Sequence, residues 1–428
     1  MKKREVSNVD ELVAATRDES TKRIVVTTVL SGVPSLRLSP GQTLTGANSN
    51  AMLHFTIGSE GIQLSSNNKV ENLEIIAASD KRVLFNDTTL NDFGVFHLQN
   101  LALTGVVQIL ASDKVRAGSI VARNVDIVSA DARAYNDRPK AYGVEVVNGA
   151  FTIWNQQSSP SLTISADLVG ISIGRPDAPV QGSGVLVSGA SEKGGKVLVL
   201  RLETGAIYSN GGIAAGTPNL ISAGVFTAYG AVVDSAHTKG PVTTYGPNDM
   251  VLDNWGVVDR WVSDQKTTSH GPSGIGFVNF GNINSLKLKA PIETFGEGAR
   301  GFNVYSGTIG SAEFDRIVTH GNGSIGIQIA QPVGNISIFR GIETHGGIGQ
   351  SLVKGVVTKL SAIALSVKPG GSVKTLKVGG GLITHGIGVS PLELHGRIET
   401  LLVNDGVIAL EGENSPSQSI KTNQRGKK

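Results

Sequence analysis

Residues 244–346 repeat one three-residue phrase five times: Thr244-Tyr245-Gly246, Ser269-His270-Gly271, Thr294-Phe295-Gly296, Thr319-His320-Gly321 and Thr344-His345-Gly346. The glycines of these phrases are 25 residues apart at each step. A sixth copy, Thr384-His385-Gly386, follows after 40 residues, and the 15 additional residues indicate one enlarged loop. A period of 20–50 residues is typical of proteins in which repeated units stack on one another.

The rest of each 25-residue unit repeats with the same period. Residues 252–256, Leu-Asp-Asn-Trp-Gly, recur at 277–281 as Phe-Val-Asn-Phe-Gly, and two apolar columns contain Val258, Ile283 and Val333, and Ile292, Ile317 and Ile342. Three short strands cannot bury an apolar face alone, so each must pair with its equivalent in the next unit, about 4.8 Å away. The sequence therefore predicts an all-β fold, a parallel β-helix with rungs of roughly 25 residues.

Residues 61–127 have a different signature, in which an asparagine precedes an alternating strand. The three copies are Asn72-Leu73-Glu74-Ile75, Asn100-Leu101-Ala102-Leu103 and Asn124-Val125-Asp126-Ile127. Asparagine tolerates the left-handed backbone conformation that a tight turn between two strands demands. Because equivalent residues stack from rung to rung, we expect these amides to hydrogen-bond along the axis.

The composition excludes several classes of protein. The 428 residues include no cysteine, which excludes disulfides, thiolate metal sites and a cysteine nucleophile. The 55 glycines suit a chain with many turns, and 38 basic against 35 acidic residues give a net charge of only +3. The sequence contains no apolar run of membrane-spanning length. We therefore expect neither nucleic acid nor a membrane as a partner.

The N-terminus predicts a short cap and no export signal. The basic start Met1–Arg4 is followed by Glu5 and other polar residues where a signal peptide would turn apolar. The expected location is cytoplasmic by default, with a secreted or phage-associated protein as the alternatives. Residues 7–16 read as an amphipathic helix with Ser7 as its N-cap and with Leu12 and Thr16 on the apolar side.

At residues 61–75 the chain resembles the pectate-lyase-like right-handed parallel β-helix superfamily. The resemblance is carried by Gly61-Ile-Gln-Leu-Ser, Asn67-Asn68 and Val70-Glu-Asn-Leu-Glu-Ile75. It implies rungs of three strands with an asparagine turn before the third, and a helix that caps the N-terminal end of the core. We expect one β-helix domain over residues 1–410 and a flexible polar tail at 411–428.

The resemblance also implies a substrate groove over the first strand of each rung. In this sequence that strand follows a glycine, as in Gly276-Phe277 and Gly301-Phe302, and we also assign Gly143-Val144 to it. The outward residues would be Glu145, Asp253, Val278, Asn303 and Gln328. The groove would be walled by loops at residues 131–142, 175–183 and 231–250.

The candidate site residues come from this groove and these loops. As catalytic candidates we take Asp131, Asp137, Arg138 and Asp253, because cleavage of a glycosidic bond needs paired carboxyl groups and β-elimination needs a base near a cation. The substrate-binding candidates are Arg133, Lys140, Glu145, His237, Asp249, Asn303 and Gln328. The competing interpretation is that these are solvated loop charges.

Two functions of different classes therefore stay open. The first is a carbohydrate-active or carbohydrate-binding protein, such as a polysaccharide lyase or a glycoside hydrolase, with an oligo- or polysaccharide as partner. The second is a non-catalytic structural or assembly protein that binds itself or another protein. No motif requires a cofactor and no metal site is assigned. Ca²⁺ binding is an open alternative that no motif indicates.

The remaining polar and aromatic motifs have a structural and a functional interpretation. His270, His320, His345 and His385 share a column with Tyr245 and Phe295, which favours a stacked ladder over a metal site. Trp255 and Trp261 could stack on sugars, although their columns favour the core. Gly321–Gly326 and Gly170–Gly174 match nucleotide-binding and serine-hydrolase patterns, but both lie in strand-forming repeats, so Ser172 is expected to be an ordinary strand residue.

Overall fold

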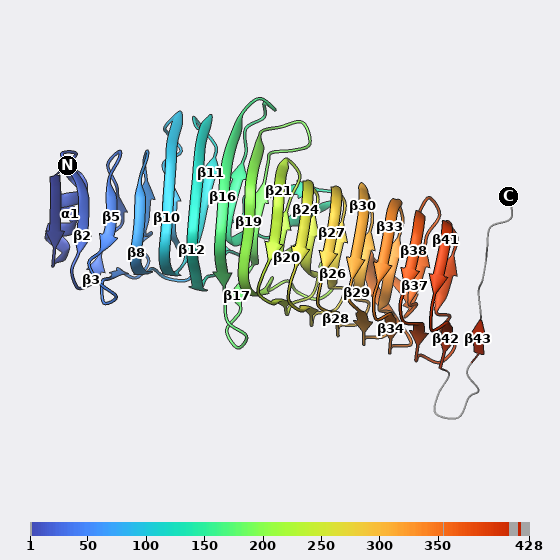
Figure 1. The fold of residues 1–428 in the computed structure, drawn as a ribbon. Coiled ribbons are helices and arrows are strands. Elements are labelled where there is room, and N and C mark those ends of the chain that lie inside the picture. Colours follow the sequence, from blue (N-terminus) through green and yellow to red (C-terminus); the bar gives the residue numbers. More distant parts are fainter. Residues whose placement is uncertain (1, 354, 411–417, 421–428) are drawn as a thin grey trace. The chain divides into compact units, whose positions relative to one another are not determined.

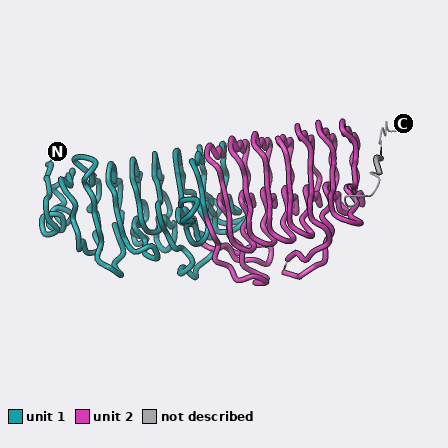
Figure 2. Tube along the Cα trace, turned by 90° about the horizontal axis from the view of Figure 1, so that it is seen from below, with its two compact units in different colours: residues 1–139, 148–208, 227–235 teal, residues 140–147, 209–226, 236–428 magenta. Residues whose placement is uncertain are grey.

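The computed structural model describes residues 2–353, 355–410 and 418–420, most of which form β-strands (Figure 1). Two compact units divide the chain (Figure 2). Unit 1 contains Met1–Pro139, Asn148–Tyr208 and Thr227–Ser235, and unit 2 contains Lys140–Val147, Ser209–Phe226 and Ala236–Lys428. The single domain expected over residues 1–410 stays a prediction. None of the helices among the described residues is long and apolar enough to cross a membrane.

In its described residues, unit 1 forms parallel strands and one short helix, which lies between the first two strands along the chain. Its strands are β1 (Lys2–Val6), β2 (Thr21–Val26), β3 (Val29–Val33), β4 (Leu36–Arg37), β5 (Thr43–Gly46), β6 (Met52–Phe55), β7 (Ile62–Leu64), β8 (Lys69–Ile76), β9 (Arg82–Asn86), β10 (Asp92–Thr104), β11 (Val106–Ala111), β12 (Ala117–Ser129), β15 (Gly149–Asn155), β16 (Thr163–Ile173), β17 (Val180–Gln181) and β18 (Ser183–Ser188). Strands β19 (Lys196–Asn210), β20 (Leu220–Thr227) and β21 (Ala231–Thr238) contribute residues to both units.

The predicted N-terminal helix is present, with its start shifted by one residue. Helix α1 spans Val9–Arg17 and buries Leu12, Ala15 and Thr16. Its N-cap is Asn8, not Ser7, because the Asn8 side chain accepts the Glu11 N–H at 2.9 Å. The Glu11 carboxylate in turn accepts the N–H of Ser7, the residue before the N-cap, at 2.8 Å. Strand β1 before the helix pairs with β2 and was not predicted.

The asparagine ladder predicted for the first part of the chain is confirmed. Asn72, Asn100 and Asn124 have φ angles of 55°, 52° and 54°, in the left-handed region. The Asn100 Nδ2 donates to Asn72 Oδ1 at 2.9 Å, and Asn124 Nδ2 donates to Asn100 Oδ1 at 3.1 Å. Each asparagine bends a long strand, so that β8, β10 and β12 each supply two sides of a rung. Ser172 lies on β16 opposite Asp126, as expected for a strand residue.

Unit 2 has three strands per rung, in the predicted order. The first strands are β23 (Asp249–Asn254), β26 (Ile275–Asn279), β29 (Arg300–Val304), β32 (Ile325–Ile329), β37 (Leu365–Val367) and β40 (Leu392–Leu394). The second strands are β24 (Val257–Ser263), β27 (Asn282–Leu288), β30 (Thr308–Phe314), β33 (Pro332–Ile338), β38 (Ser372–Val378) and β41 (Arg397–Val403). The third strands are β22 (Val242–Thr244), β25 (Thr267–Ser269), β28 (Ile292–Thr294), β31 (Ile317–Thr319), β34 (Ile342–Thr344), β39 (Leu382–Thr384) and β42 (Val407–Ala409).

The repeat columns of unit 2 correspond to pairing between rungs. Ile292 pairs with Ile317, and Ile317 with Ile342, and all three side chains are buried. The glycines within the first strands β26, β29 and β32 lie against this column. A Cβ on Gly301 would lie 2.2 Å from Ile317 Cγ2, which no side chain can tolerate without a shift. Glycine therefore marks the place where the first and third strands approach most closely.

Three segments differ from the sequence-based expectation: two expected loops and one expected strand. Residues 231–250 are mainly strands β21 and β22 and the start of β23, because their alternating apolar residues point into the core. Gly143-Val144 does not begin a rung, since β13 (Lys140–Ala141) and β14 (Val144–Val146) form a short hairpin. The enlarged loop is a second hairpin, β35 (Ile348–Val353) with β36 (Val356–Ser361).

The predicted tail falls largely on residues 411–417 and 421–428, which lie outside the described residues. The three described residues of this segment form strand β43 (Gln418–Ile420), which pairs antiparallel with β42.

Candidate functional site

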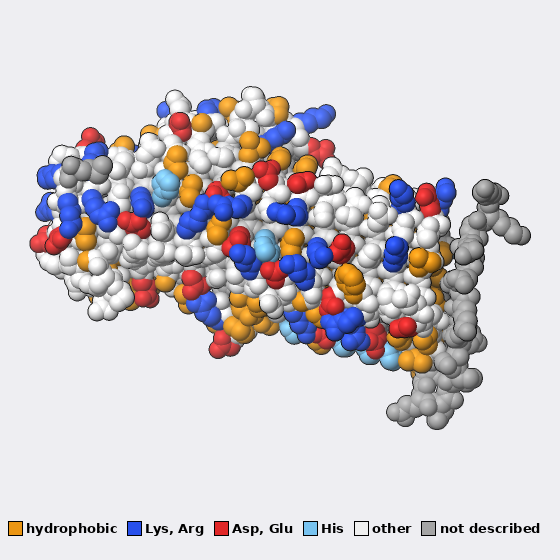
Figure 3. Space-filling view, viewed as in Figure 1, with side chains coloured by type: hydrophobic (Ala, Val, Ile, Leu, Met, Phe, Trp, Pro, Cys, Tyr) orange, Lys and Arg blue, Asp and Glu red, His pale blue; other side chains and the backbone are white. Residues whose placement is uncertain are grey.

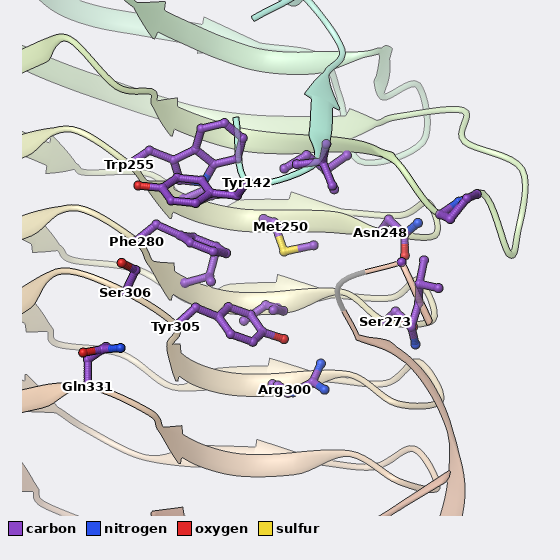
Figure 4. Close-up of a pocket in the computed structure, with 18 residues that line it drawn as sticks. Tyr142, Asn248, Met250, Trp255, Ser273, Phe280, Arg300, Tyr305, Ser306 and Gln331 are labelled. Carbon is purple, nitrogen blue, oxygen red and sulfur yellow. The ribbon is translucent and has the colours of Figure 1, made fainter. Parts of the chain in front are cut away.

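A cavity of about 410 Å³ lies over the first strands of unit 2 (Figure 4). Its floor is formed by β23, β26 and β29, whose outward residues Asp253 and Val278 lie in register, one rung apart. This is the strand face on which the sequence placed the groove. The cavity is bounded by residues of all three segments of unit 2, so it lies entirely within this unit.

One wall of the cavity consists of stacked aromatic rings. Trp255, Phe280 and Tyr305 occupy one repeat column, and their ring centroids are 5.9 Å and 5.1 Å apart from rung to rung. Tyr142 packs over Trp255 and Phe280, with centroids 5.3 Å and 4.6 Å away, and it is 44% exposed. Figure 4 shows the three rings of the column one below the other with Tyr142 over Trp255. Such rings offer flat faces for a ligand ring.

Arg300 is the only cation among the described residues that line the cavity (Figure 4). Its residue exposure is 1%, although arginine is almost never buried without a paired anion. The Nε and Nη2 atoms have no hydrogen-bond partner among the described residues, and Nη1 makes only a long contact of 3.5 Å with the Gly298 carbonyl. A buried guanidinium in this state favours an anionic ligand.

Asp253 is the single carboxyl group among the described residues that line the cavity, and it is fully buried. Burial raises the pKa of Asp253 well above its usual range, and the neighbouring Trp255 opposes this shift only in part. The protonated form is therefore favoured. A neutral carboxylic acid can both donate and accept a hydrogen bond, as the hydroxyl groups of a ligand require.

The hairpin β35–β36 closes another side of the cavity, where it contributes Leu352. Its first strand is fixed to the turns before β26 and β29. The Ser351 hydroxyl donates to the Gly298 carbonyl at 2.8 Å, and the Leu352 N–H donates to Ser273 Oγ at 3.0 Å. The hairpin thus contacts Ser273, which precedes Leu352 by 79 residues in the sequence, and it forms part of the cavity wall.

The charged loop at residues 131–138 belongs to unit 1, where its groups bind one another. The Asp131 carboxylate accepts two bonds from Arg133, at 2.9 and 2.7 Å. The Arg138 guanidinium donates to the carbonyls of Tyr135 and Arg133, and Asp137 accepts from Gln156 at 2.5 Å. Since Asp253 lies in unit 2, neither unit contains all four catalytic candidates, and the contacts of this loop do not favour a catalytic role.

Three of the substrate-binding candidates form ion pairs within unit 2. Lys140 and Glu145 are cross-strand neighbours in the hairpin β13–β14, with Nζ and Oε1 2.7 Å apart. Glu145 therefore lies outside the column of Asp253, contrary to the expectation. His237 Nε2 lies 2.7 Å from Asp264 Oδ2, and Lys289 contacts the other oxygen of the same carboxylate.

Asp249 is buried and has a structural function. Its Oδ2 accepts the N–H groups of Gly211 and Gly246 at 2.9 and 2.7 Å, and its Oδ1 accepts the Ser222 hydroxyl at 2.5 Å. Burial raises the pKa of Asp249 to about 6, although these three hydrogen bonds oppose the shift. The carboxyl group joins two segments of unit 2, residues 209–226 and 236–428, and does not line the cavity.

Asn303 and Gln328 continue the column of Asp253 and Val278, as expected. They pair in register on β29 and β32 and are buried, and neither lines the cavity. The amide Nδ2 and Oδ1 of Asn303 have no hydrogen-bond partner among the described residues. Substrate binding by this pair stays a prediction.

Arg300, Tyr305 and Tyr142 line the cavity but were not among the candidate residues predicted from the sequence. Arg300 had a detectable signal, because its repeat column otherwise contains the apolar residues Met250, Ile275 and Ile325. A charged side chain is unusual in a buried apolar column, so this position could have been selected as a candidate. Tyr305 likewise continues the column of Trp255 and Phe280. Tyr142 gave no such signal, because it stands outside the 25-residue repeat.

The two tryptophans have different environments. Trp261 is fully buried and its ring meets Phe277 edge-on at 5.2 Å, which confirms the expected core position. Trp255 is 4% exposed, but it also lines the cavity.

The predicted histidine ladder is confirmed on the third strands of unit 2. Its rings stack in the order Tyr245, His270, Phe295, His320, His345 and His385, with centroids 4.3–5.2 Å apart.

Comparisons of the chain with protein-family models, with curated proteins and with solved structures found no match.

Proposed function

We propose that unit 2 binds an acidic sugar, such as a uronic acid unit of an oligosaccharide, in the cavity over β23, β26 and β29. The observation that supports this most strongly is Arg300, a buried guanidinium whose Nε and Nη2 lack partners among the described residues. A planar carboxylate can accept two parallel hydrogen bonds from these atoms. The ligand would thereby neutralise a charge that the described contacts leave buried.

The aromatic wall supports a sugar rather than an inorganic anion. Trp255, Phe280 and Tyr305 offer ring faces along the cavity, and sugar rings present apolar C–H faces that pack on them. Burial raises the pKa of Asp253 and favours its protonated form, which could exchange hydrogen bonds with sugar hydroxyl groups. The volume of about 410 Å³ lies within the range of small-molecule pockets.

Binding is the function that these residues support better than cleavage. Glycoside hydrolysis ordinarily uses two carboxyl groups on either side of the bond, and the described lining residues contribute one. A glycoside hydrolase therefore has less support than a binding protein. A lyase reaction would require a base near the sugar, and the burial that raises the pKa of Asp253 disfavours the ionised carboxylate that a base needs.

The test is calorimetric titration of the purified chain with galacturonate and glucuronate oligomers and with their neutral counterparts. We expect binding of an acidic oligomer and at least about tenfold weaker binding of its neutral counterpart. The variant Arg300→Met should weaken acidic binding by about 100-fold or more, because one partner of a buried charged contact is lost. The matched control, Arg201→Met in unit 1, should leave binding unchanged. Equal affinity for acidic and neutral sugars, or no binding to either, would reject the proposal.

The second candidate is assembly through the hairpin β35–β36. Its exposed residues Ile348, Val356 and Val357 have exposures of 50%, 64% and 58%, high for apolar side chains. A second copy of the chain could cover them. Light scattering over a range of concentrations tests this, because a dimer that becomes a monomer in Val356→Lys would support the hairpin as the interface. A strict monomer would exclude it.

A further inference from the structure

The histidine ladder is tightest at its last step. The centroids of His345 and His385 are 4.3 Å apart and their rings are inclined by 15°, whereas the preceding steps are 4.6–5.2 Å long and inclined by at most 8°. These two residues directly follow strands β34 and β39, and the hairpin β35–β36 is inserted between those two strands. Figure 3 shows histidine side chains in a row among charged groups along the lower edge of the molecule.

Glu343 brings a carboxylate to this closest pair. It lies on β34, and its Oε1 is 2.8 Å from Nε2 of His385 and 3.3 Å from Nε2 of His345. Its other oxygen, Oε2, is bound by Arg316. The arginine therefore orients the carboxylate so that Oε1 faces both imidazoles. The three ligand atoms all lie within 4.8 Å of one another.

This ligand set has the chemistry and spacing of a transition-metal site. Two imidazole nitrogens and one carboxylate oxygen suit Zn²⁺ and related ions, and ligands bound at about 2.0 Å in a tetrahedron are about 3.3 Å apart. The two separations from Oε1 are close to that value. The side chains of Glu343, His345 and His385 are 18%, 36% and 32% exposed, so an ion can enter and keep a water ligand.

We propose that Glu343, His345 and His385 bind one divalent transition-metal ion of the Zn²⁺ class at the edge of unit 2. Arg316 acts as a positioning residue that holds the carboxylate through Oε2. This site lies on the third strands and involves none of the residues that line the cavity, so it is independent of the proposed sugar binding.

A neighbouring part of the same ladder offers an internal comparison. Glu293 occupies the position of Glu343 two rungs earlier, and its Oε1 lies 3.0 Å from His320 Nε2. The ring next to it in the ladder is Phe295, which cannot bind a metal. This arrangement therefore has one carboxylate and one imidazole, and we expect it to bind the ion far more weakly.

The experiment is titration of the metal-stripped chain, purified without a histidine tag, with Zn²⁺ alone by calorimetry and with Co²⁺ by visible absorption. We expect one ion per chain and a tetrahedral Co²⁺ spectrum. The variant His385→Phe should weaken Zn²⁺ binding by about 100-fold or more, because a ligand is lost while the ring stack is kept. The matched variant His320→Phe should change the affinity by less than about threefold.

Three results would count against the proposed metal site. Zn²⁺ binding to His385→Phe with the affinity of the unmodified chain, or no stoichiometric binding to the unmodified chain, would overturn it. A loss in His320→Phe as large as in His385→Phe would place the ion elsewhere on the ladder. Thermal melts of both variants show whether each remains folded, and the phenylalanine already present at position 295 indicates that the column accepts this ring.

Discussion

The two units differ in how certain of their arginine side chains are paired. In unit 1, Arg123 and Arg201 both bind Asp167, and Arg175 binds Asp126 through two hydrogen bonds of 3.0 and 2.7 Å. In unit 2, Arg300 is buried and its Nε and Nη2 have no partner among the described residues. These three arginines of unit 1 pair with carboxylates of the unit, whereas Arg300 in the cavity of unit 2 is left for a ligand.

The turns between strands also differ between the units. In unit 1 a left-handed asparagine bends one long strand, and the amides bond from rung to rung. In unit 2 separate strands follow one another, and glycines allow the first strand to approach the third. A close backbone approach leaves little room for extra residues beside these glycines, in keeping with the 25-residue steps from Gly246 to Gly346. An asparagine turn allows the strands on either side to vary in length.

The largest expected effect is the loss of this close approach in unit 2. In Gly301→Ala the new Cβ would lie 2.2 Å from Ile317 Cγ2 and 2.6 Å from the Gly326 carbonyl oxygen, and Ile317 is buried and has no room to move. We expect a loss of about 4 kcal/mol in the free energy of unfolding, measured with urea. Gly347→Ala is the matched control, because its Cβ would meet only Asn322 Oδ1, at 3.7 Å. Similar stabilities of the two variants would contradict the explanation of the glycine column.

The second prediction concerns two carboxyl groups with opposite pKa shifts. Burial raises the pKa of Asp249 in unit 2 to about 6, while the bond from Arg201 lowers the pKa of Asp167 in unit 1. The folded state therefore binds the Asp249 proton more tightly than the unfolded state, and this contribution to stability is lost as the pH rises from about 4 to about 6. The Asp167 contribution has the other sign and is lost as the pH falls below its usual pKa.

Asp249→Asn should therefore raise stability at pH 7.5 by on the order of 3 kcal/mol. The asparagine oxygen can accept the N–H groups of Gly211 and Gly246, and its NH₂ can donate to the Ser222 hydroxyl. Urea unfolding at pH 4.5 and 7.5 measures the difference, and Asp167→Asn serves as the comparison, with a loss of stability at pH 7.5. Equal pH dependence of Asp249→Asn and the unmodified chain would refute the assigned sign.

The third prediction tests the asparagine ladder of unit 1. Asn100→Ala should cost about 2 kcal/mol of unfolding free energy, because alanine tolerates the left-handed conformation poorly and two ladder hydrogen bonds are lost. Asn100→Gly should recover about half of this loss, since glycine removes the backbone cost but not the loss of the hydrogen bonds. If the two variants are equally stable, the backbone conformation contributes nothing to the preference for asparagine.

Much of this architecture was predictable from the sequence, because in a β-helix equivalent residues pair directly. The columns of Ile292 and Asn100 and the histidine ladder all follow from periodicity. The cavity was less predictable, since Tyr142 and the hairpin that carries Leu352 lie outside the period, and the direction of a loop is set by contacts distant in sequence. The charged loop around Asp131 misled the site assignment, because its charges bind one another.

The smallest expected effect is on the stability of Arg300→Met. Methionine removes a guanidinium whose Nε and Nη2 are buried without partners, so we expect a gain of about 1 kcal/mol in the free energy of unfolding in the absence of ligand. Arg201→Met in unit 1 removes an exposed ion pair and should change stability by less than about 0.5 kcal/mol in either direction. A large loss of stability in Arg300→Met would mean that the unit itself uses this charge.

The most direct test of the central claim is a crystal structure of the chain soaked with the acidic sugar that binds most tightly in the calorimetric titration. The account predicts the sugar carboxylate within hydrogen-bond distance of Nε and Nη2 of Arg300, with the sugar ring against Phe280 and Tyr305. A structure in which the sugar binds elsewhere, and in which Arg300 is paired with Asp253 in a closed cavity, would contradict it.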